Sequence, residues 1–265
     1  MDRLRRVVGP EVELHAVESA SAFPTEIGTA FELHRAVAAE VAAARCGGAL
    51  PLVLSGNCNS SLGTVAGLQA AAAAAPGGPV GVVWLDGHGD CSTPETFTGD
   101  FLDSMGLSTL TGRCWQALAA TVPGFRPVPD ERVLLVGGHG MDEGSRRVLA
   151  ASRIERLPVD EMRARGVEAA LAPALDALAL AGVRRVYLHL DVDVLDAAFA
   201  PANGFAPEGG LLPEQVLATV EATAGRFPIA AAAVASFDPA YDREDRVLDL
   251  ALRFLDRVVR RGTAF

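Results

Sequence analysis

Two short stretches of this chain join an apolar run to acidic residues at alternating positions. In the first, residues 82–85 are apolar and Asp86, His88 and Asp90 follow directly. An apolar run of this kind favours a buried strand, and alternate residues of an extended chain point to the same side. Two carboxylates and an imidazole that meet at the end of a buried strand are costly to desolvate unless a cation compensates them. The spacing therefore predicts a divalent metal site.

The second stretch repeats the arrangement. Residues 186–190 form another strand-like run, which leads into Asp191 and Asp193 on a shared face. Neighbouring parallel strands would bring all five side chains to the carboxyl edge of the sheet, where open α/β sheets bind their ligands. Four carboxylates and one imidazole are typical of sites for manganese-like ions, whereas zinc sites are often rich in thiolates. Each stretch alone could be a polar loop with a chance pattern, but their joint presence favours the metal site. For His189 we expect only burial in the sheet.

The composition limits the classes of partner. The chain has 265 residues, 50% of them hydrophobic, which allows a substantial core. Its net charge of −10 argues against nucleic acid and against anionic membrane surfaces. No apolar run is long enough to span a bilayer, and residues 1–6 lack an apolar signal core, so we expect a cytoplasmic protein. The four cysteines have no paired spacing, which fits a reducing compartment.

Strand and helix patterns alternate along the whole chain. Strands are expected at residues 12–17, 50–54, 80–85, 132–136, 153–157, 185–190 and 229–236. Helices are expected at residues 25–45, 60–75, 106–120, 143–151, 159–181 with a break at Gly166, 214–224 and 243–261. Such alternation predicts a parallel sheet with helices on both faces, in one domain that covers residues 1–265. The loop of about twenty residues after residue 85 is far longer than ordinary connections, so we expect it to be functional.

These motifs resemble the signatures of the ureohydrolase family, which includes arginase, agmatinase and their relatives, and the chain is similar to a divergent member. The similarity runs from about residue 52 to residue 211, through the motifs at 54–60, 86–94 and 191–210, with weaker support at 236–239. The resemblance implies a three-layer α/β/α sandwich around a mostly parallel sheet, with a binuclear manganese centre. It also implies a homo-oligomer, a trimer or a hexamer.

The resemblance also implies how the metal ligands are shared. Asp86 and Asp191 would bridge two divalent ions, most simply Mn²⁺. Asp90 would complete one site, and His88 with Asp193 would complete the other.

The first of the three motifs departs from the family pattern. The family has Gly-Gly-Asp-His-Ser, whereas here Asn57 stands at the aspartate and Cys58 at the histidine ligand. A thiolate can bind a divalent metal, and a nearby cation would lower the pKa of Cys58 enough to allow this. The alternative is a small buried cysteine that packs inertly. Under that alternative only one of the two metal sites would be complete.

The positions that would face the substrate depart further. Ser92 and Gly99 stand where the resemblance places the residues that hold the amino-acid end of arginine. Asp142 matches an aspartate that contacts a substrate amino group. Ser236 replaces a carboxylate that would pair with the guanidinium, and Asp238, two residues on, is the nearest substitute. Because a buried planar cation needs a bidentate acid, this replacement argues against arginine as the substrate.

We therefore expect a hydrolase of a linear C–N bond in a small polar guanidino, amidino or formimino compound, through a hydroxide that bridges two metals. Asp90 would orient that hydroxide and relay its proton, and Asp103 stands at the position of a family histidine with a proton-transfer role. Two alternatives stay open. Cys58 and Ser236 are compatible with a mononuclear metal amidohydrolase or deacylase, and the altered substrate positions are compatible with a non-catalytic relative.

Overall fold

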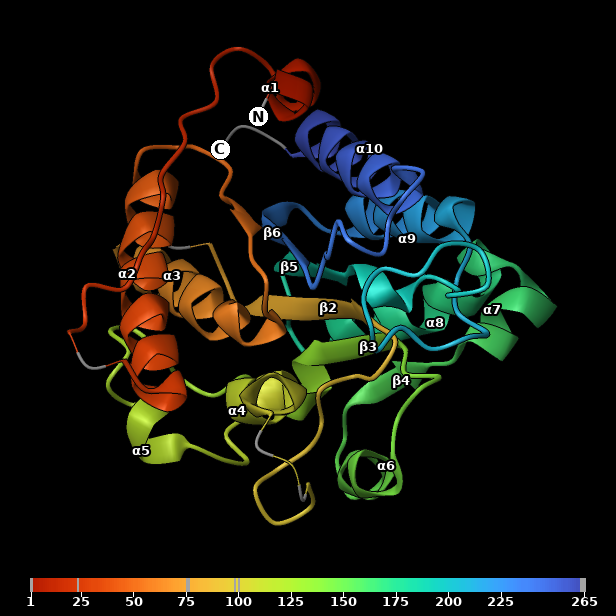
Figure 1. Cartoon of the computed structure of the whole chain (residues 1–265), viewed down its shortest axis with the longest axis horizontal. Helices are drawn as coiled ribbons and strands as arrows, with labels where there is room; N and C mark the ends of the chain where they lie inside the picture. The colour runs from red at the N-terminus through yellow and green to blue at the C-terminus, as the bar shows by residue number, and fades with distance from the viewer. Residues whose placement is uncertain (1, 23, 75–76, 98, 100, 263–265) are drawn as a thin grey trace.

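Six strands pair in parallel into one sheet, in the order β1-β6-β5-β2-β3-β4 (Figure 1). The computed structural model describes residues 2–22, 24–74, 77–97, 99 and 101–262. Within them the strands are β1 (Leu52–Leu54), β2 (Val80–Asp86), β3 (Val133–Gly137), β4 (Glu155–Leu157), β5 (Arg185–Asp191) and β6 (Ile229–Ala235). Strands β2 and β5 are direct neighbours, with Trp84 opposite His189. The prediction that the two acidic stretches follow adjacent strands is confirmed.

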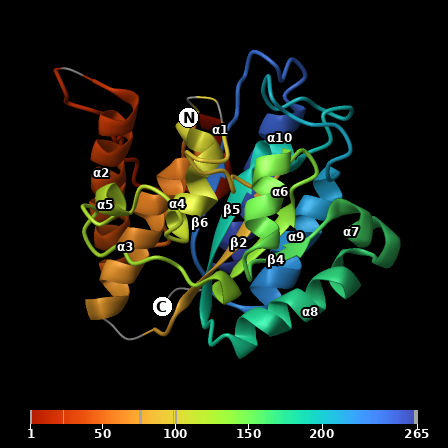
Figure 2. The same ribbon diagram turned by 90° about the horizontal axis from the view of Figure 1, so that it is seen from below.

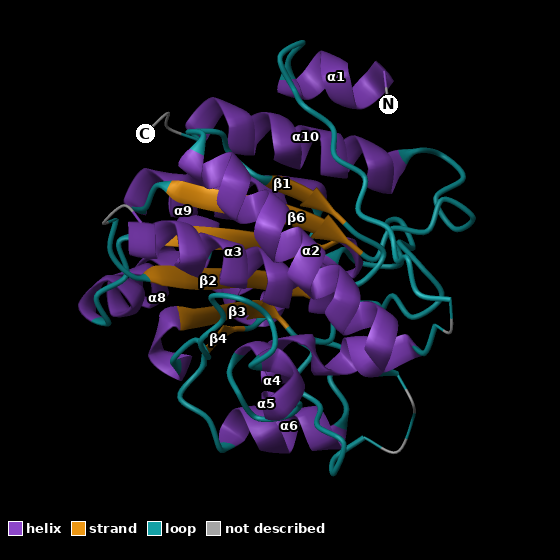
Figure 3. Ribbon diagram, turned by 90° about the vertical axis from the view of Figure 1, so that its left-hand side faces the viewer, coloured by secondary structure: helices purple, strands orange, loops and turns teal. Residues whose placement is uncertain are grey.

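Helices cover both faces of the sheet, as Figures 2 and 3 show. One face is covered by α2 (Glu26–Cys46), α3 (Ser61–Ala74), α4 (Gly106–Leu110), α5 (Gln116–Ala119) and α6 (Glu143–Ala150). The other is covered by α1 (Asp2–Val8), α7 (Val159–Arg165), α8 (Val167–Leu180), α9 (Pro213–Arg226) and α10 (Arg246–Arg261). The predicted three-layer α/β/α sandwich is therefore confirmed.

Side chains of the central strands enter two separate apolar clusters. Along β2, Val82 and Trp84 pack with α2, α3 and α4, whereas Val83 and Leu85 pack with the helices of the opposite face. Successive strand residues point to opposite faces, so a strand that is apolar at every position must be covered on both sides. Because Asp86 lies two residues beyond Trp84, it emerges on the face of α2 and α3. None of the helices in the described ranges combines the length and the apolarity needed to cross a bilayer.

The strand predicted at residues 12–17 is wrong. This segment has no strand partner and lies along α2, where His15 Nδ1 is 2.9 Å from a carboxylate oxygen of Glu40. Beyond it, Ser19 donates a hydrogen bond to Glu32 of the same helix. Leu14 and Ala16, two of the apolar residues of the alternating pattern, are exposed, so the pattern does not mark a buried face. Helix α1, which precedes the segment, was not predicted.

Two predicted helices are interrupted by residues with positive φ. The helix expected at 106–120 is divided into α4 and α5, because Gly112 and Trp115 have φ values of 78° and 51°. The break expected at Gly166 is confirmed, since this residue separates α7 from α8 with a φ of 79°. The predicted end of the 60–75 helix falls on residue 75, which lies outside the described residues.

Candidate metal centre

Five potential ligands gather at the carboxyl ends of β2 and β5. They form two groups, in each of which one ligand atom per residue lies within 4.8 Å of the others. One group contains Cys58, Asp86 and Asp191, and the other contains Asp86, His88 and Asp193. His88 is partly exposed, while the other four side chains are buried. Asp86 belongs to both groups, as a bridging ligand must.

Backbone N–H groups orient three of these carboxylates. His88 N donates to Asp86 Oδ1 at 2.6 Å, and Asp193 N donates to Asp191 Oδ1 at 2.8 Å. Gly87 N reaches across from β2 to Asp193 Oδ1 at 3.0 Å. A side chain at Gly87 would place its Cβ only 2.7 Å from the carbonyl oxygen of Asp193, so the two loops approach too closely for a larger residue. Backbone donors therefore fix the orientation of these acidic side chains.

Asp90 carries a buried carboxylate oxygen without a partner. Its Oδ2 accepts no hydrogen bond from any described residue. Its backbone is firmly held, because the carbonyl oxygen accepts from Leu107 N and Ser108 N, both at 3.1 Å. Burial, together with the charge of Asp86, raises the pKa of Asp90 well above its ordinary value. A bare buried carboxylate oxygen beside other carboxylates is the arrangement that a cation would satisfy.

The cluster as a whole has more negative charge than its one imidazole can balance. Burial and the charge of Asp193 raise the pKa of Asp86 to about 6. Burial and Asp193 also raise the pKa of Asp191. Although burial alone would lower the pKa of His88, its hydrogen bond to Asp193 and the nearby carboxylates raise this pKa to about 9. His88 Nδ1 lies 3.1 Å from Asp193 Oδ2, so one ion pair relieves part of the repulsion. The residues present therefore fit divalent cations.

Cys58 lies among polar groups. It opens the 3₁₀ turn η1 (Cys58–Ser60), after β1 and before α3, and its side chain is fully buried. Its Sγ donates to Asp191 Oδ2 at 2.8 Å and lies 3.1 Å from His189 Nε2. Burial and the charge of Asp191 raise the pKa of the thiol strongly, so Cys58 stays protonated when no cation is bound. This environment differs from the apolar one of an inert packing cysteine.

Asp103 stabilises the turn that carries Cys58. It lies in the 3₁₀ turn η2 (Leu102–Met105), and its two carboxylate oxygens accept from Cys58 N at 3.0 Å and Asn59 N at 2.8 Å. These bonds satisfy the free N–H groups at the start of η1. Burial nevertheless raises the pKa of Asp103. The observed contacts therefore hold the turn that carries Cys58.

Replacement of Asp103 by alanine is expected to lower the free energy of unfolding by about 2 kcal/mol, because two buried N–H groups lose a shared acceptor. Asp103→Asn keeps one acceptor oxygen and should lose less. Urea unfolding of both variants would test this, with Ser104→Ala as the control, since the Ser104 hydroxyl bonds only to the carbonyl of Phe101 among described residues. Equal stability of Asp103→Ala and the parent chain would contradict the assignment.

Ser236 is the one predicted substrate residue that joins the ligand groups. Its Oγ donates to Asp191 Oδ2 at 2.7 Å and lies 3.5 Å from Cys58 Sγ. Its φ of 65° is unusual for a residue other than glycine and turns the chain sharply after β6. Asp238 lies in the following loop, where it accepts from the N–H of Ala240 at 2.8 Å.

Ser92 and Asp142 lie together at the start of α6. The Ser92 hydroxyl is 2.9 Å from that of Ser145, and Asp142 caps the helix by accepting from Ser145 N at 2.6 Å. Asp142 is exposed, whereas Ser92 is buried. Neither residue belongs to a ligand group.

The aromatic rings of Trp84 and His189 lie next to the ligand groups, and neither was predicted to contribute to the metal site. Trp84 and His189 stack with their centroids 3.8 Å apart and their planes inclined by 24°. Trp84 Nε1 donates to Asp86 Oδ2 at 2.7 Å, while His189 lies against Cys58. Burial lowers the pKa of His189 to about 3, so its ring is neutral. Each ring lies two residues before a ligand aspartate. Because alternate residues of a strand point to the same side, the sequence already indicated that each ring lies on the same side as that aspartate.

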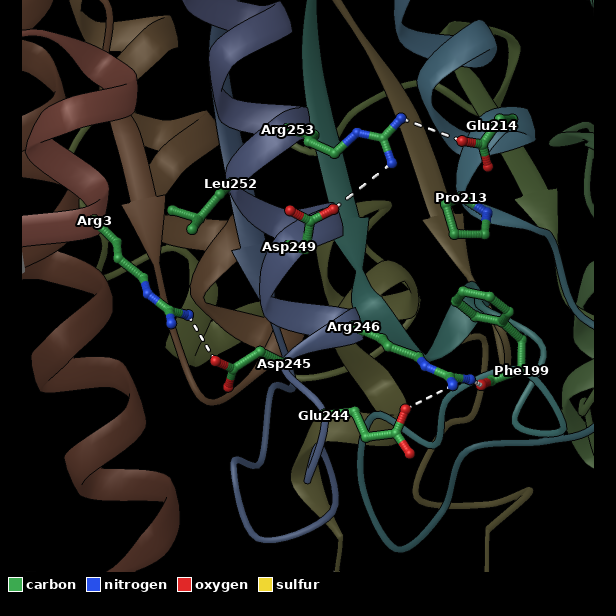
Figure 4. Close-up of a pocket in the computed structure, with 10 residues that line it drawn as sticks. All are labelled: Arg3, Phe199, Pro213, Glu214, Glu244, Asp245, Arg246, Asp249, Leu252 and Arg253. Atoms are coloured by element: carbon green, nitrogen blue, oxygen red, sulfur yellow. Dashed lines mark hydrogen bonds and ion pairs between the residues drawn. The ribbon is translucent and has the colours of Figure 1, made fainter.

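A surface cleft of about 700 Å³ lies elsewhere, between α1, α9 and α10 (Figure 4). Its charged side chains pair with one another. Arg3 lies 2.7 Å from Asp245, and Arg253 lies 3.2 Å from Glu214 and 3.7 Å from Asp249. None of the residues that line it belongs to either ligand group.

Comparisons with known proteins agree with this geometry. The model of the arginase family matches residues 4–259. An N(omega)-hydroxy-L-arginine amidinohydrolase from Streptomyces lavendulae is 36% identical over 141 residues, which span 53% of this chain and 45% of that protein, less than half of its length. An arginase from Bacillus subtilis is 27% identical over 210 residues, 79% of this chain and 68% of that protein. The crystal structure of arginase from Bacillus cereus superposes with a TM-score of 0.79 at 25% identity, covering 88% and 79% of the two chains.

Proposed function

The chain belongs to the arginase family, and from this premise we propose that it hydrolyses a linear C–N bond in a small guanidino, amidino or formimino compound, with the help of two divalent cations. The observation that carries the proposal is the pair of ligand groups that share Asp86. The names of the relatives, arginase and an amidinohydrolase of N(omega)-hydroxy-L-arginine, support the guanidino class.

The cations would be held by Asp86 between the two groups, by Cys58 and Asp191 on one side, and by His88 and Asp193 on the other. When bound, such cations supply a nucleophilic hydroxide near neutral pH and stabilise negative charge on the reacting centre. The oxygen and imidazole donors of the second group support manganese there, as the sequence resemblance implies.

We assign proton transfer to Asp90. Its unpartnered Oδ2 lies in a buried position, so this oxygen is free to accept a proton from the nucleophile and to pass it to the leaving amine. For Asp103 we propose a positioning role, because both of its oxygens already accept hydrogen bonds from the turn that carries Cys58. Asp103 would influence the reaction through the placement of that side chain.

The substrate is proposed to differ from arginine. Ser236 stands where a carboxylate would pair with a guanidinium, and its hydroxyl is bonded to Asp191. The carboxylate of Asp238 accepts a hydrogen bond within its own turn. A guanidinium that enters this site would lack a bidentate acid, so a less basic reacting group fits better. Ser92 and exposed Asp142 at the start of α6 are the proposed contacts for the far end of the substrate.

We also propose a homo-oligomer, a trimer or a hexamer.

Replacement of Asp191 by alanine is expected to abolish turnover, because this change removes a ligand and leaves Cys58 and Ser236 without their shared acceptor. The test is a screen of guanidino, amidino and formimino compounds for release of urea or ammonia by manganese-loaded protein. Turnover retained by Asp191→Ala would overturn the metal-dependent mechanism.

Metal stoichiometry separates the alternatives. Two cations per chain support the binuclear hydrolase. One cation per chain would favour the mononuclear amidohydrolase or deacylase that Cys58 makes conceivable. No bound cation, together with no activity in the screen, would indicate a non-catalytic relative.

A further inference from the structure

The two ligand groups differ in the softness of their donor atoms. Besides the shared Asp86, one group offers an imidazole and a carboxylate from His88 and Asp193, and the other offers a sulfur and a carboxylate from Cys58 and Asp191. Thiolates select zinc and similar soft or borderline cations, whereas carboxylates and imidazole accept manganese. The two positions therefore do not favour the same ion.

A chain of buried hydrogen-bonding groups orients the Sγ atom of Cys58. His189 Nδ1 lies 3.1 Å from Ser61 Oγ and 3.0 Å from Tyr187 Oη, while His189 Nε2 lies 3.1 Å from Cys58 Sγ. A hydroxyl that donates to Nδ1 leaves the Nε2 hydrogen directed at the sulfur. Stacking on Trp84 fixes the plane of the imidazole. Such donors behind a ligand set its orientation and strengthen metal binding.

Asp90 lies beside the turn that carries Cys58. A Cβ added to Gly106 would lie 3.2 Å from Asp90 Oδ2 and 3.5 Å from the backbone carbonyl carbon of Cys58, so Gly106 packs closely against both residues. This Asp90 oxygen is buried and has no partner among the described residues. Cys58, Asp86 and Asp191 together supply one sulfur and two carboxylates. Three protein ligands with a thiolate among them would leave a fourth position for solvent or substrate, as catalytic zinc sites do.

We propose that the centre is a mixed-metal one, in which the group around Cys58 binds zinc or another thiophilic divalent cation while the group around His88 binds manganese. The inference rests on the proposed function, since it names the metal at one of its two positions. His189 is the positioning residue of the sulfur ligand. Inert packing of Cys58 does not explain its polar contacts with Asp191, His189 and Ser236.

Cobalt substitution tests the sulfur ligand directly. The intact chain is stripped with a chelator, titrated with Co²⁺, and followed by near-ultraviolet absorption, where cobalt bound to a thiolate gives a charge-transfer band. We expect the band in the parent chain and its loss in Cys58→Ser and Cys58→His. Cys91→Ser is the matched control, because Cys91 is a second buried thiol, whose Sγ donates to the carbonyl oxygen of Gly89 at 3.1 Å, and this variant should keep the band.

Metal selectivity gives a second readout. Because zinc generally binds nitrogen and oxygen ligands more tightly than manganese does, the chain is exposed to a large excess of Mn²⁺ over Zn²⁺. Elemental analysis of the parent chain should then find one zinc and one manganese per chain. Cys58→His, with an imidazole in place of the thiol, should shift the content toward manganese. His189→Phe keeps a ring against Trp84 but removes the donor, so the cobalt band should persist with an affinity about 10- to 100-fold lower.

The outcomes separate this inference from the proposed function. Two bound cobalt ions without a sulfur band, or a band that survives in Cys58→Ser, would overturn the thiolate ligand and leave the binuclear hydrolase standing. A sulfur band without hydrolysis of any compound in the screen would support the thiolate site and overturn the hydrolase. If Cys58→Ser fails to fold, the absence or presence of the band in the parent chain and in Cys58→His still decides the question.

Discussion

Asp86→Asn is expected to lower kcat/KM by at least about 10³-fold, since loss of metal-dependent stabilisation worth several kcal/mol has this effect on rate. The metal content should fall from two cations per chain to less than one. Asp86 is shared by both ligand groups, so its replacement weakens both positions together. Asparagine keeps an oxygen for the indole N–H of Trp84 or the backbone of His88 but loses the charge that holds the cations.

Steady-state kinetics on any active compound and elemental analysis would check this prediction. Asp160→Asn is the matched control, because the Asp160 side chain is 97% exposed, and it should retain both activity and metal. If Asp86→Asn kept two cations per chain, Asp86 would not be the shared ligand. Loss of one cation only would place Asp86 in a single site.

Asp90→Asn is expected to stabilise the metal-free protein, raising its free energy of unfolding by about 1–3 kcal/mol at neutral pH, because a buried and unpartnered charge is removed. The same change should abolish proton transfer. Cations bind the folded parent chain and stabilise it by mass action, and the variant should gain less from added metal. Stability and function are therefore expected to change in opposite directions. Urea unfolding with and without Mn²⁺ would measure both effects.

The pH dependence has a defined sign. Because the pKa of Asp90 is raised in the folded state, its ionisation destabilises the metal-free fold as pH rises above the ordinary carboxyl range and through the raised pKa. The stability advantage of Asp90→Asn should therefore be largest at neutral or higher pH and should shrink as the solution is acidified. Equal stability of variant and parent chain at every pH would mean that this carboxylate is not an uncompensated charge.

The sequence was sufficient to predict the elements that depend on local pattern. The runs at 82–85 and 186–190 became β2 and β5, because continuous apolar residues must be buried on both faces of a sheet. Asp86, His88, Asp191 and Asp193 then followed from strand alternation and from the adjacency of those strands. The spacing within each motif needed no knowledge of distant contacts, whereas the pairing of β2 with β5 was an expectation about topology.

Features that depend on distant contacts could not be predicted in this way. Asp103 caps the turn at Cys58 across 45 residues of sequence, and nothing near either residue signals the pairing. The alternation at 12–17 resembles a strand, but Leu14 is exposed and the side chain that contacts α2 is the polar His15. The division of α4 from α5 depends on the left-handed conformation of Trp115, which is rare for an aromatic residue and carries no sequence signal.

The position of Trp84 next to the ligand groups has a consequence for the fluorescence of the protein. Trp84 is fully buried, lies against His189 and donates to Asp86, so its indole is joined by one hydrogen bond to the ligand shared by both groups. A cation bound to Asp86 would change the electric field at the indole and therefore its fluorescence emission. The second tryptophan, Trp115, instead donates its Nε1–H to Met105 Sδ at 3.3 Å and has no hydrogen bond to a ligand among the described residues. The chain therefore carries a built-in fluorescent reporter at the strand ends.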